Sequence, residues 1–171
     1  MTSSVQYWSD RFAQLRKGHR SGVVRQHKPI LLLAVIDLID EGIIVSPKIE
    51  LTDELIQAFR ENWAAAFPDE VPGMPQLPFF HLRGDKFWTL IAKPGAETAL
   101  AALDRPRTVP RLREIVEAAE LDQDLWKVLR EPQARTQLRL QLLANHFAPN
   151  VQQSLVVSEE ERRIVAQYRQ S

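Results

Sequence analysis

The sequence predicts an α+β fold that is mainly α-helical, with a helical core around a buried central helix and a small antiparallel β-hairpin or sheet. Apolar residues recur at the three- and four-residue spacing of helices along much of the chain. Residues 30–39 are apolar on nearly every side, which is typical of a buried helix. Short stretches of β-branched and aromatic residues lie beside turn-forming residues. With 171 residues, 44% of them hydrophobic, the chain is long enough for one compact domain with its own core.

The N-terminal part of the chain predicts two helices separated by an exposed loop. Four apolar residues share one face of the first helix, over residues 3–17: Val5, Trp8, Phe12 and Leu15. The segment 18–26 contains two glycines and several polar residues, so we expect an exposed loop there. In the helix that follows, Pro29 suits the first turn and Gly42 suits the residue after the last turn. Its apolar character predicts that it is the central core element, with its N-terminus at the basic loop.

The next segment predicts short strands followed by a helix. We expect two strands, at 43–45 and 48–51, on either side of a Ser-Pro turn. Thr52 is expected to cap the helix, because its hydroxyl can accept a hydrogen bond from an N–H group of the first turn. The helix carries five large apolar residues: Leu55, Ile56, Phe59, Trp63 and Phe67.

Prolines and a tight turn shape residues 68–91. The segment 68–78 contains four prolines and a glycine and is expected to form no regular element. The stretches 79–83 and 86–91 flank the dipeptide Gly84-Asp85, a pattern that predicts a β-hairpin. A short helix is expected to follow at 96–103.

The last third of the chain is helical in pattern. It contains two apolar helical faces: Leu112, Ile115, Val116 and Ala119, and then Leu125, Trp126 and Leu129. Pro132 is expected to open a further helix, since proline is tolerated at the first helical position. Ser158 and Glu161 match the spacing of a capping box and predict a last short helix that ends near Tyr168.

The domain organisation and the cellular location follow from composition. We expect residues 1–150 to form the functional domain and residues 151–171 to form a polar C-terminal tail or linker helix. No apolar run approaches the roughly 20 residues that span a bilayer, and the N-terminus lacks the features of a secretory signal. The absence of cysteine excludes disulfides, thiolate metal sites and cysteine nucleophiles. We therefore expect a cytoplasmic protein without membrane contact.

The net charge is zero, but the charges are unevenly distributed. Residues 37–70 carry nine acidic side chains against two basic ones. A stretch without any acidic residue precedes them and contains Arg11, Arg16, Lys17, His19, Arg20, Arg25, His27 and Lys28. A second basic cluster contains Arg105, Arg107, Arg111 and Arg113. Such a distribution attracts and orients polyanions such as DNA.

Catalytic and cofactor-binding motifs are absent from the sequence. There is no P-loop, dinucleotide-binding glycine motif or nucleophile elbow, and the four histidines are scattered. We therefore expect no catalytic residue, no metal, no cofactor and no small-molecule substrate. The chain is predicted to be a binding domain rather than an enzyme.

Three stretches resemble the sulfur-binding domain of phosphorothioation-dependent, McrA-like HNH restriction endonucleases. The first is H-K-P-I-L-L-L at His27 to Leu33, and the second is P-F-F-x-L-x-x-D-x-x-W from Pro78 to Trp88. The third is L-x-x-x-L-x-x-P-x-x-R-x-x-L with the Leu143 and Phe147 that follow it. The resemblance extends over residues 5–150. Two positions depart from the family pattern, since His146 and Leu77 stand where the family often has aromatic residues.

The resemblance implies that the chain binds double-stranded DNA in which sulfur replaces a non-bridging phosphate oxygen. Sulfur is less strongly hydrated than oxygen, so an apolar pocket can accept it at lower cost. The implied sulfur pocket consists of Leu77, Pro78, Phe79, His81 and His27. The implied contacts to the phosphate and the DNA backbone are Lys28, Arg25, Arg20, Arg83, Lys17 and Arg16. The candidates for base readout, which would give some flanking-sequence preference, are His19, Arg20 and Gln26.

Cleavage in the resembling proteins belongs to a separate C-terminal nuclease domain of His-Asn-His type, so a nuclease domain or a partner nuclease is the expected protein partner. The alternative interpretation is a generic DNA-binding or protein-interaction module without sulfur preference. A third possibility, a nuclease, requires carboxylates or histidines that converge on a metal, and the first basic stretch contains no carboxylate.

Overall fold

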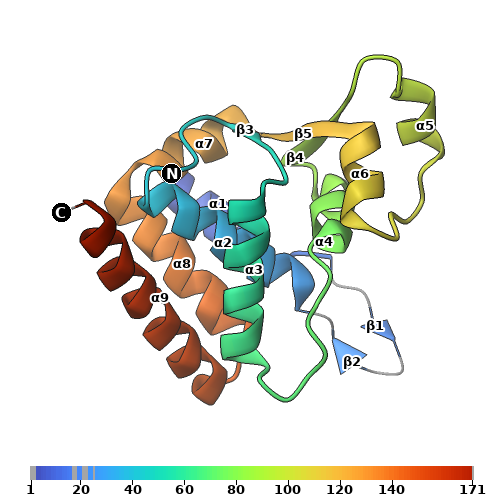
Figure 1. Ribbon diagram of the computed structural model, residues 1–171. Coiled ribbons are helices and arrows are strands. Elements are labelled where there is room, and N and C mark those ends of the chain that lie inside the picture. Colours follow the sequence, from blue (N-terminus) through green and yellow to red (C-terminus); the bar gives the residue numbers. More distant parts are fainter. Residues whose placement is uncertain (1–2, 17–18, 21–22, 25, 171) are drawn as a thin grey trace.

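Helices form most of the molecule, and a small antiparallel sheet lies along one edge (Figure 1). This computed structural model describes residues 3–16, 19–20, 23–24 and 26–170. The predicted α+β, mainly helical class is confirmed. No helix in these ranges is long and apolar enough to cross a membrane.

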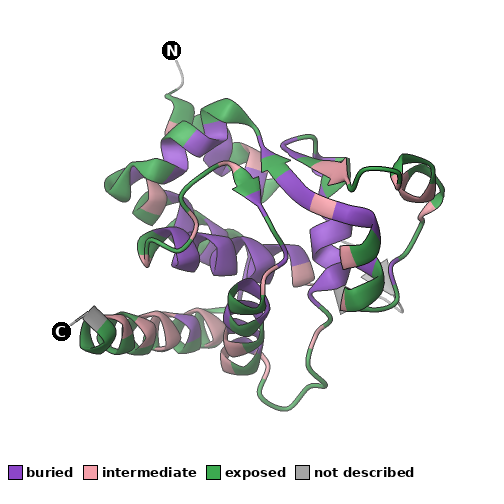
Figure 2. Ribbon diagram, turned by 45° about the horizontal axis from the view of Figure 1, so that its top comes forward, coloured by how far each residue is buried: buried purple, intermediate pink, exposed green. Residues whose placement is uncertain are grey.

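Helix α2 (His27–Asp40) is the buried centre of the fold, as predicted. Every side chain from Lys28 to Ile39 is buried. The helix contacts α3 (Asp53–Ala66), α4 (Gln76–His81) and α8 (Pro132–His146), which surround it (Figures 1 and 2). Gly42 follows its C-terminus with a φ of 75°, a conformation that glycine adopts without steric cost.

Helix α1 (Ser4–Ala13) is shorter than the predicted 3–17. It packs on α8 and on α7 (Gln123–Arg130), with Trp8 and Phe12 buried. Leu15 is buried as predicted, although it lies beyond the end of the helix. The expected exposed loop after α1 contains two short antiparallel strands, β1 (His19–Arg20) and β2 (Val23–Val24).

The predicted helix after Thr52 is confirmed as α3. The Thr52 hydroxyl accepts a hydrogen bond of 3.1 Å from the backbone N–H of Leu55. The acidic residues in the first turn suit the positive end of the helix dipole.

Helix α9 (Pro149–Gln170) lies along α3. The predicted start at Ser158 is wrong, because the helix begins nine residues earlier and Ser158 lies within it. Leu155 is fully buried, and Arg162 donates hydrogen bonds to Glu41 and Glu61. Burial opposes the charge of Arg162, but the hydrogen bond and the charges of these carboxylates raise its pKa above the usual value. Residues 151–170 are therefore packed on the body, and a functional boundary at residue 150 stays a prediction.

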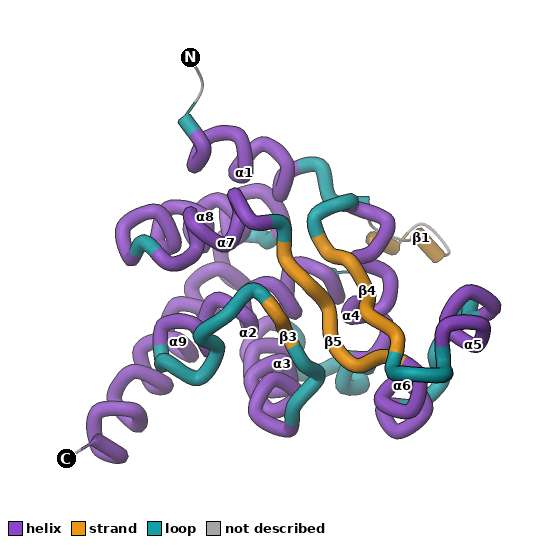
Figure 3. The backbone as a smooth tube through the Cα atoms, turned by 90° about the horizontal axis from the view of Figure 1, so that it is seen from above, coloured by secondary structure: helices purple, strands orange, loops and turns teal. Residues whose placement is uncertain are grey.

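The sheet has the strand order β3–β5–β4, and both pairs are antiparallel (Figure 3). Strand β5 (Val116–Leu121) pairs with β3 (Lys48–Ile49) on one side and with β4 (Trp88–Ala92) on the other. The helical face predicted for 112–119 is wrong, because α6 (Val109–Ile115) ends where β5 begins. The predicted strand at 43–45 is wrong as well, since these described residues form no strand and β3 pairs with β5 instead.

The hairpin predicted for 79–91 is also wrong. Its first half belongs to α4 and to the 3₁₀ helix η1 (Leu82–Asp85), and its second half, β4, pairs with β5. Proline is tolerated in the first turn of α4 because its missing N–H would have no partner inside the helix. A hydrogen bond of 2.7 Å from Trp88 Nε1 to the carbonyl of Phe79 ties α4 to the start of β4.

The remaining helices follow the prediction more closely. The expected short helix at 96–103 is α5 (Glu97–Ala102), and Pro132 opens α8 as expected. A buried polar group links α8 to the centre of the fold. Asp37 on α2 accepts hydrogen bonds from Arg139 at 2.5 Å and from Asn62 at 2.8 Å.

Candidate nucleic-acid interface

The basic segment between α1 and α2 forms a β1–β2 hairpin that projects from the helical body (Figure 1). Of the predicted DNA-contacting residues in this segment, Lys17 and Arg25 lie outside the described residues. The structure places the backbones of His19 and Arg20 in β1. Arg16 immediately precedes the hairpin segment and has an exposed side chain. The hairpin therefore lies outside the helical body, in a segment of the chain that is rich in cationic residues.

Asp85 holds together the residues on both sides of this basic segment through hydrogen bonds. Its carboxylate accepts a hydrogen bond of 2.8 Å from the backbone N–H of Arg16 and one of 2.5 Å from the ammonium group of Lys28. Its carbonyl accepts a third, of 2.7 Å, from Arg11. Lys28 and Asp85 are both buried, so their ion pair belongs to the interior. The predicted phosphate contact Lys28 is thus bonded to a carboxylate, and its role toward DNA stays a prediction.

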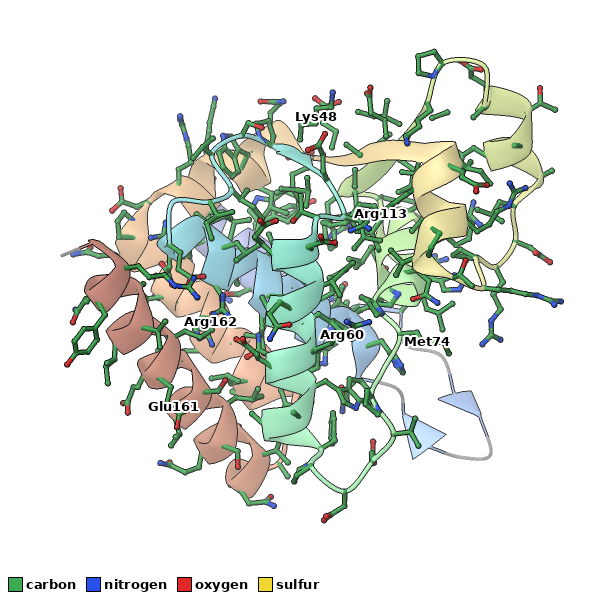
Figure 4. The ribbon with its side chains drawn as sticks, viewed as in Figure 1. Lys48, Arg60, Met74, Arg113, Glu161 and Arg162 are labelled. Atoms are coloured by element: carbon green, nitrogen blue, oxygen red, sulfur yellow. The ribbon has the colours of Figure 1, made fainter. Side chains whose placement is uncertain are left out.

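A surface depression of about 380 Å³ lies beside the N-terminal turn of α4. It is lined by Met74, Leu77, Arg105, Pro106 and Arg107. The side chain of Gln76 donates a hydrogen bond of 3.0 Å to the carbonyl of Arg107, which holds the arginine segment against α4. Met74 lies on the segment that leads to α4, on the same side of the molecule as the β1–β2 hairpin (Figure 4). Apolar side chains and two guanidinium groups therefore share one small concavity.

The predicted pocket residues do not all meet in this depression. Leu77 lines it, and Pro78 is buried in the same helical turn. Phe79 is buried against Trp88, with 5.2 Å between the ring centroids. His81 is exposed at the end of α4, whereas the ring of His27 packs against Trp63, 4.6 Å away. The structure thus joins Leu77 to two arginines and places Phe79, His81 and His27 outside the lining of the depression.

The second basic cluster divides into two pairs with different environments. Arg111 forms a 3.0 Å ion pair with Glu114, and Arg113 forms one of the same length with Asp53. Arg105 and Arg107 line the depression instead. Sequence reasoning singled out this cluster by its charge but did not assign it to the site. Only Arg111 has its partner nearby in the chain, since Arg113 pairs with the distant Asp53 and Asp104 directly precedes Arg105, so no local signal separates the two pairs.

Comparison of the sequence with models of known protein families identifies the family of this chain. The family model of the ScoMcrA-like DNA sulfur-binding domain matches residues 6–158. The chain belongs to this family. No curated protein matches the chain. The chain is accordingly a DNA-binding domain of a family that recognises phosphorothioated DNA in restriction–modification, and the domain is not itself catalytic. Among the residues that the structure describes, no three histidine or acidic side chains could together hold a metal ion.

Gln26, a further candidate for base readout by this sulfur-binding domain, lies at the N-terminus of α2. The side chain of Gln26 donates a hydrogen bond of 2.7 Å to the carbonyl of His146. The ring of His146 in turn donates one of 2.7 Å, through Nε2, to the carbonyl of Phe12. The predicted base contact Gln26 therefore also links the start of α2 to α8, and base readout by its side chain stays a prediction.

Arg83 is the second residue of η1, which directly follows α4. Its guanidinium carbon is 4.0 Å from the centroid of the Phe80 ring, within the range of a cation–π contact. The side chain is exposed, so the stacking orients a cation that remains accessible to a phosphate.

Gly73 lies against the ring of Trp63, which in turn packs against the ring of His27. A Cβ atom at Gly73 would lie 2.8 Å from the Trp63 ring. This ring is buried, and its N–H donates to the carbonyl of Val71, so it has little room to move. Gly73→Ala is expected to destabilise the sulfur-binding domain by about 1–3 kcal/mol. Urea denaturation measures this loss. Gly84→Ala is the matched control, because a Cβ atom there meets nothing within 4 Å, and an equal loss in both variants would contradict the prediction.

Proposed function

We propose that this sulfur-binding domain holds the phosphorothioate sulfur in the depression beside Leu77. The observation that carries the proposal is the composition of this concavity, whose lining combines Leu77, Met74 and Pro106 with two arginines. The sulfur would face the apolar side chains, and the charged oxygen of the same phosphate would face Arg105 and Arg107. A guanidinium group can form charge-assisted, bidentate hydrogen bonds with such an oxygen.

Discrimination against ordinary DNA then rests on desolvation. An unmodified phosphate would place a strongly hydrated oxygen against apolar side chains that offer it no hydrogen bond. A buried polar group without a partner costs about 1–3 kcal/mol, which corresponds to roughly 5- to 150-fold in affinity.

The β1–β2 hairpin supports a second part of the proposal. A two-stranded ribbon fits the major groove, where base edges are distinguishable. His19 and Arg20 lie in β1, so their side chains are the proposed source of flanking-sequence preference, with Gln26 at the start of α2. Arg16, Lys17, Arg25 and Arg83 would add contacts to the phosphates and make the affinity depend on salt.

The proposal extends to the partner of this domain. In the proteins that the sequence resembles, a separate nuclease domain cleaves the DNA, so the proposed role is to bring a nuclease domain or partner nuclease to modified DNA in the cytoplasm. The alternative, a generic DNA-binding or protein-interaction module, predicts no difference between modified and plain DNA.

The test is a fluorescence-polarisation titration with two duplexes that differ only in one Rp phosphorothioate, at several salt concentrations and with several flanking sequences. We expect the modified duplex to bind about 5- to 150-fold more tightly. Equal affinities on every flanking sequence would overturn sulfur recognition and favour the generic module.

A further inference from the structure

A second depression, of about 200 Å³, lies at the opposite end of the α4–η1 segment from Leu77. It is lined by Arg11, Gln14, Arg16, Gly84, Asp85 and Lys86. Its cations come from the last turn of α1, from the start of the basic segment and from the residue after η1. Three separate parts of the chain thus bring positive charge to one small polar concavity.

The charges in this depression do not cancel. Asp85 is its one acidic lining residue, and its carboxylate forms the buried ion pair with Lys28. Arg11, Arg16 and Lys86 therefore leave an excess of positive charge. The C-terminus of α1 contributes only about half a negative charge, which these cations outweigh.

Two of the cationic side chains in this depression, Arg16 and Lys86, are exposed to solvent. The carboxylate of Asp85 accepts a hydrogen bond from the backbone N–H of Arg16, and the Arg16 side chain is exposed. Lys86 is exposed too, and its φ of 69° is the left-handed conformation that a lysine adopts only at a cost. The tight turn at Lys86 directs the chain from η1 toward β4 and places the lysine at the rim of the depression.

The two depressions lie close enough together to contact one DNA duplex. Leu77 and Lys86 are joined by most of α4 and all of η1, so their Cα atoms lie at most about 18 Å apart, given the rise of these helices and the final step to Lys86. Both depressions are therefore close enough together to contact one duplex, whose major groove is roughly 12 Å wide. The β1–β2 hairpin begins beside the second depression, because Arg16 lines it.

We propose that the second depression is a phosphate site that binds the DNA backbone away from the sulfur, with Arg11 and Lys86 as phosphate ligands in addition to Arg16. The proposal rests on the proposed function only in taking DNA as the ligand. The site holds an ordinary phosphate, so it raises the affinity for modified and unmodified DNA by the same factor. It anchors the duplex while the depression beside Leu77 reads the sulfur.

The test uses Lys86→Gln in the full chain, titrated by fluorescence polarisation against the modified and the unmodified duplex between low and moderate salt. Loss of one phosphate contact lowers the slope of log K against log salt by about 0.9, and the affinity at 0.1 M salt falls by about eightfold. We expect both duplexes to show this loss equally. Lys86→Arg keeps the charge and should keep the slope. Lys127→Gln, at an exposed lysine on α7, is the matched control and should change neither quantity.

The possible results separate the two proposals. An unchanged slope for Lys86→Gln, or a loss confined to the modified duplex, would overturn the phosphate site. If the unmutated domain binds both duplexes equally but Lys86→Gln still lowers the slope, sulfur recognition fails and the phosphate site stands. Absence of DNA binding by the unmutated domain would overturn both. Arg16→Gln repeats the test at a second exposed cation of the same depression.

Discussion

The variant Leu77→Asp should bind modified and unmodified DNA with nearly equal affinity. Leu77 is 7% exposed and lines the depression beside Arg105 and Arg107. A carboxylate at this position would pair with the arginines, repel the phosphate and replace the apolar surface that accepts sulfur. The preference of roughly 5- to 150-fold that we expect from the unmutated domain would then fall to about one.

Paired titrations with the two duplexes measure this ratio, and circular dichroism shows whether the variant is folded. Leu77→Met keeps an apolar side chain of similar volume and should keep most of the preference. Leu77→Thr introduces a hydroxyl without a charge and shortens the apolar side chain, and it serves if the aspartate variant unfolds; we expect it to reduce the preference. A full sulfur preference in folded Leu77→Asp would show that the sulfur binds elsewhere.

The variant Asp85→Asn should lose about 3–5 kcal/mol of folding stability. The amide oxygen can still accept the N–H of Arg16, but the charge that neutralises Lys28 is gone. A buried ammonium without its partner is among the most destabilising features that a single substitution can create. The loss is a large part of the 5–15 kcal/mol that stabilises a typical domain.

Urea denaturation at neutral pH tests this expectation. The double variant Lys28→Met with Asp85→Asn removes the buried charge as well, so it should recover most of the loss. A single Asp85→Asn variant as stable as the unmutated domain would mean that Lys28 is solvated in solution and does not depend on Asp85.

Much of the helical framework could be predicted from the sequence because its signals are local. Proline in the first turn and glycine after the last turn set the limits of α2, and the apolar residues between them required burial on all sides. The hydroxyl of Thr52 fixed the start of α3 in the same way. Each of these signals acts within one helical turn, so it does not depend on the rest of the fold.

The strands expected at 48–51 and 86–91 contain most of β3 and β4, but their pairing through β5 could not be predicted, because the partners lie far apart in the chain. The run V-E-A-A-E-L of β5 is rich in alanine and glutamate, which favour helices. It becomes a strand because β3 and β4 both pair with it, and this tertiary context overrides the local preference. The aromatic residues after Pro78 suggested a strand because aromatic residues are common in strands. In the structure they are buried in α4 instead.

The candidate site was predicted in part. The family resemblance pointed to the turn that contains Leu77 and Pro78, and the charge pattern singled out Arg105 and Arg107. That these residues share one concavity depends on the hydrogen bond between Gln76 and the carbonyl of Arg107. Gln76 carried no sequence signal, because a glutamine beside two prolines resembles any polar loop residue.

The central position of β5 has a consequence for the order in which the domain is made. Glu120 pairs with both Lys48 and Thr89, so β3 and β4 leave the ribosome well before the strand that joins them. Until residues 116–121 emerge, the nascent chain carries strand edges without a partner, which favour aggregation. The segment 105–107, which completes the depression beside Leu77, leads through α6 into β5. Fragments that end before Val116 should therefore lack a formed depression beside Leu77, even though they contain all of its lining residues.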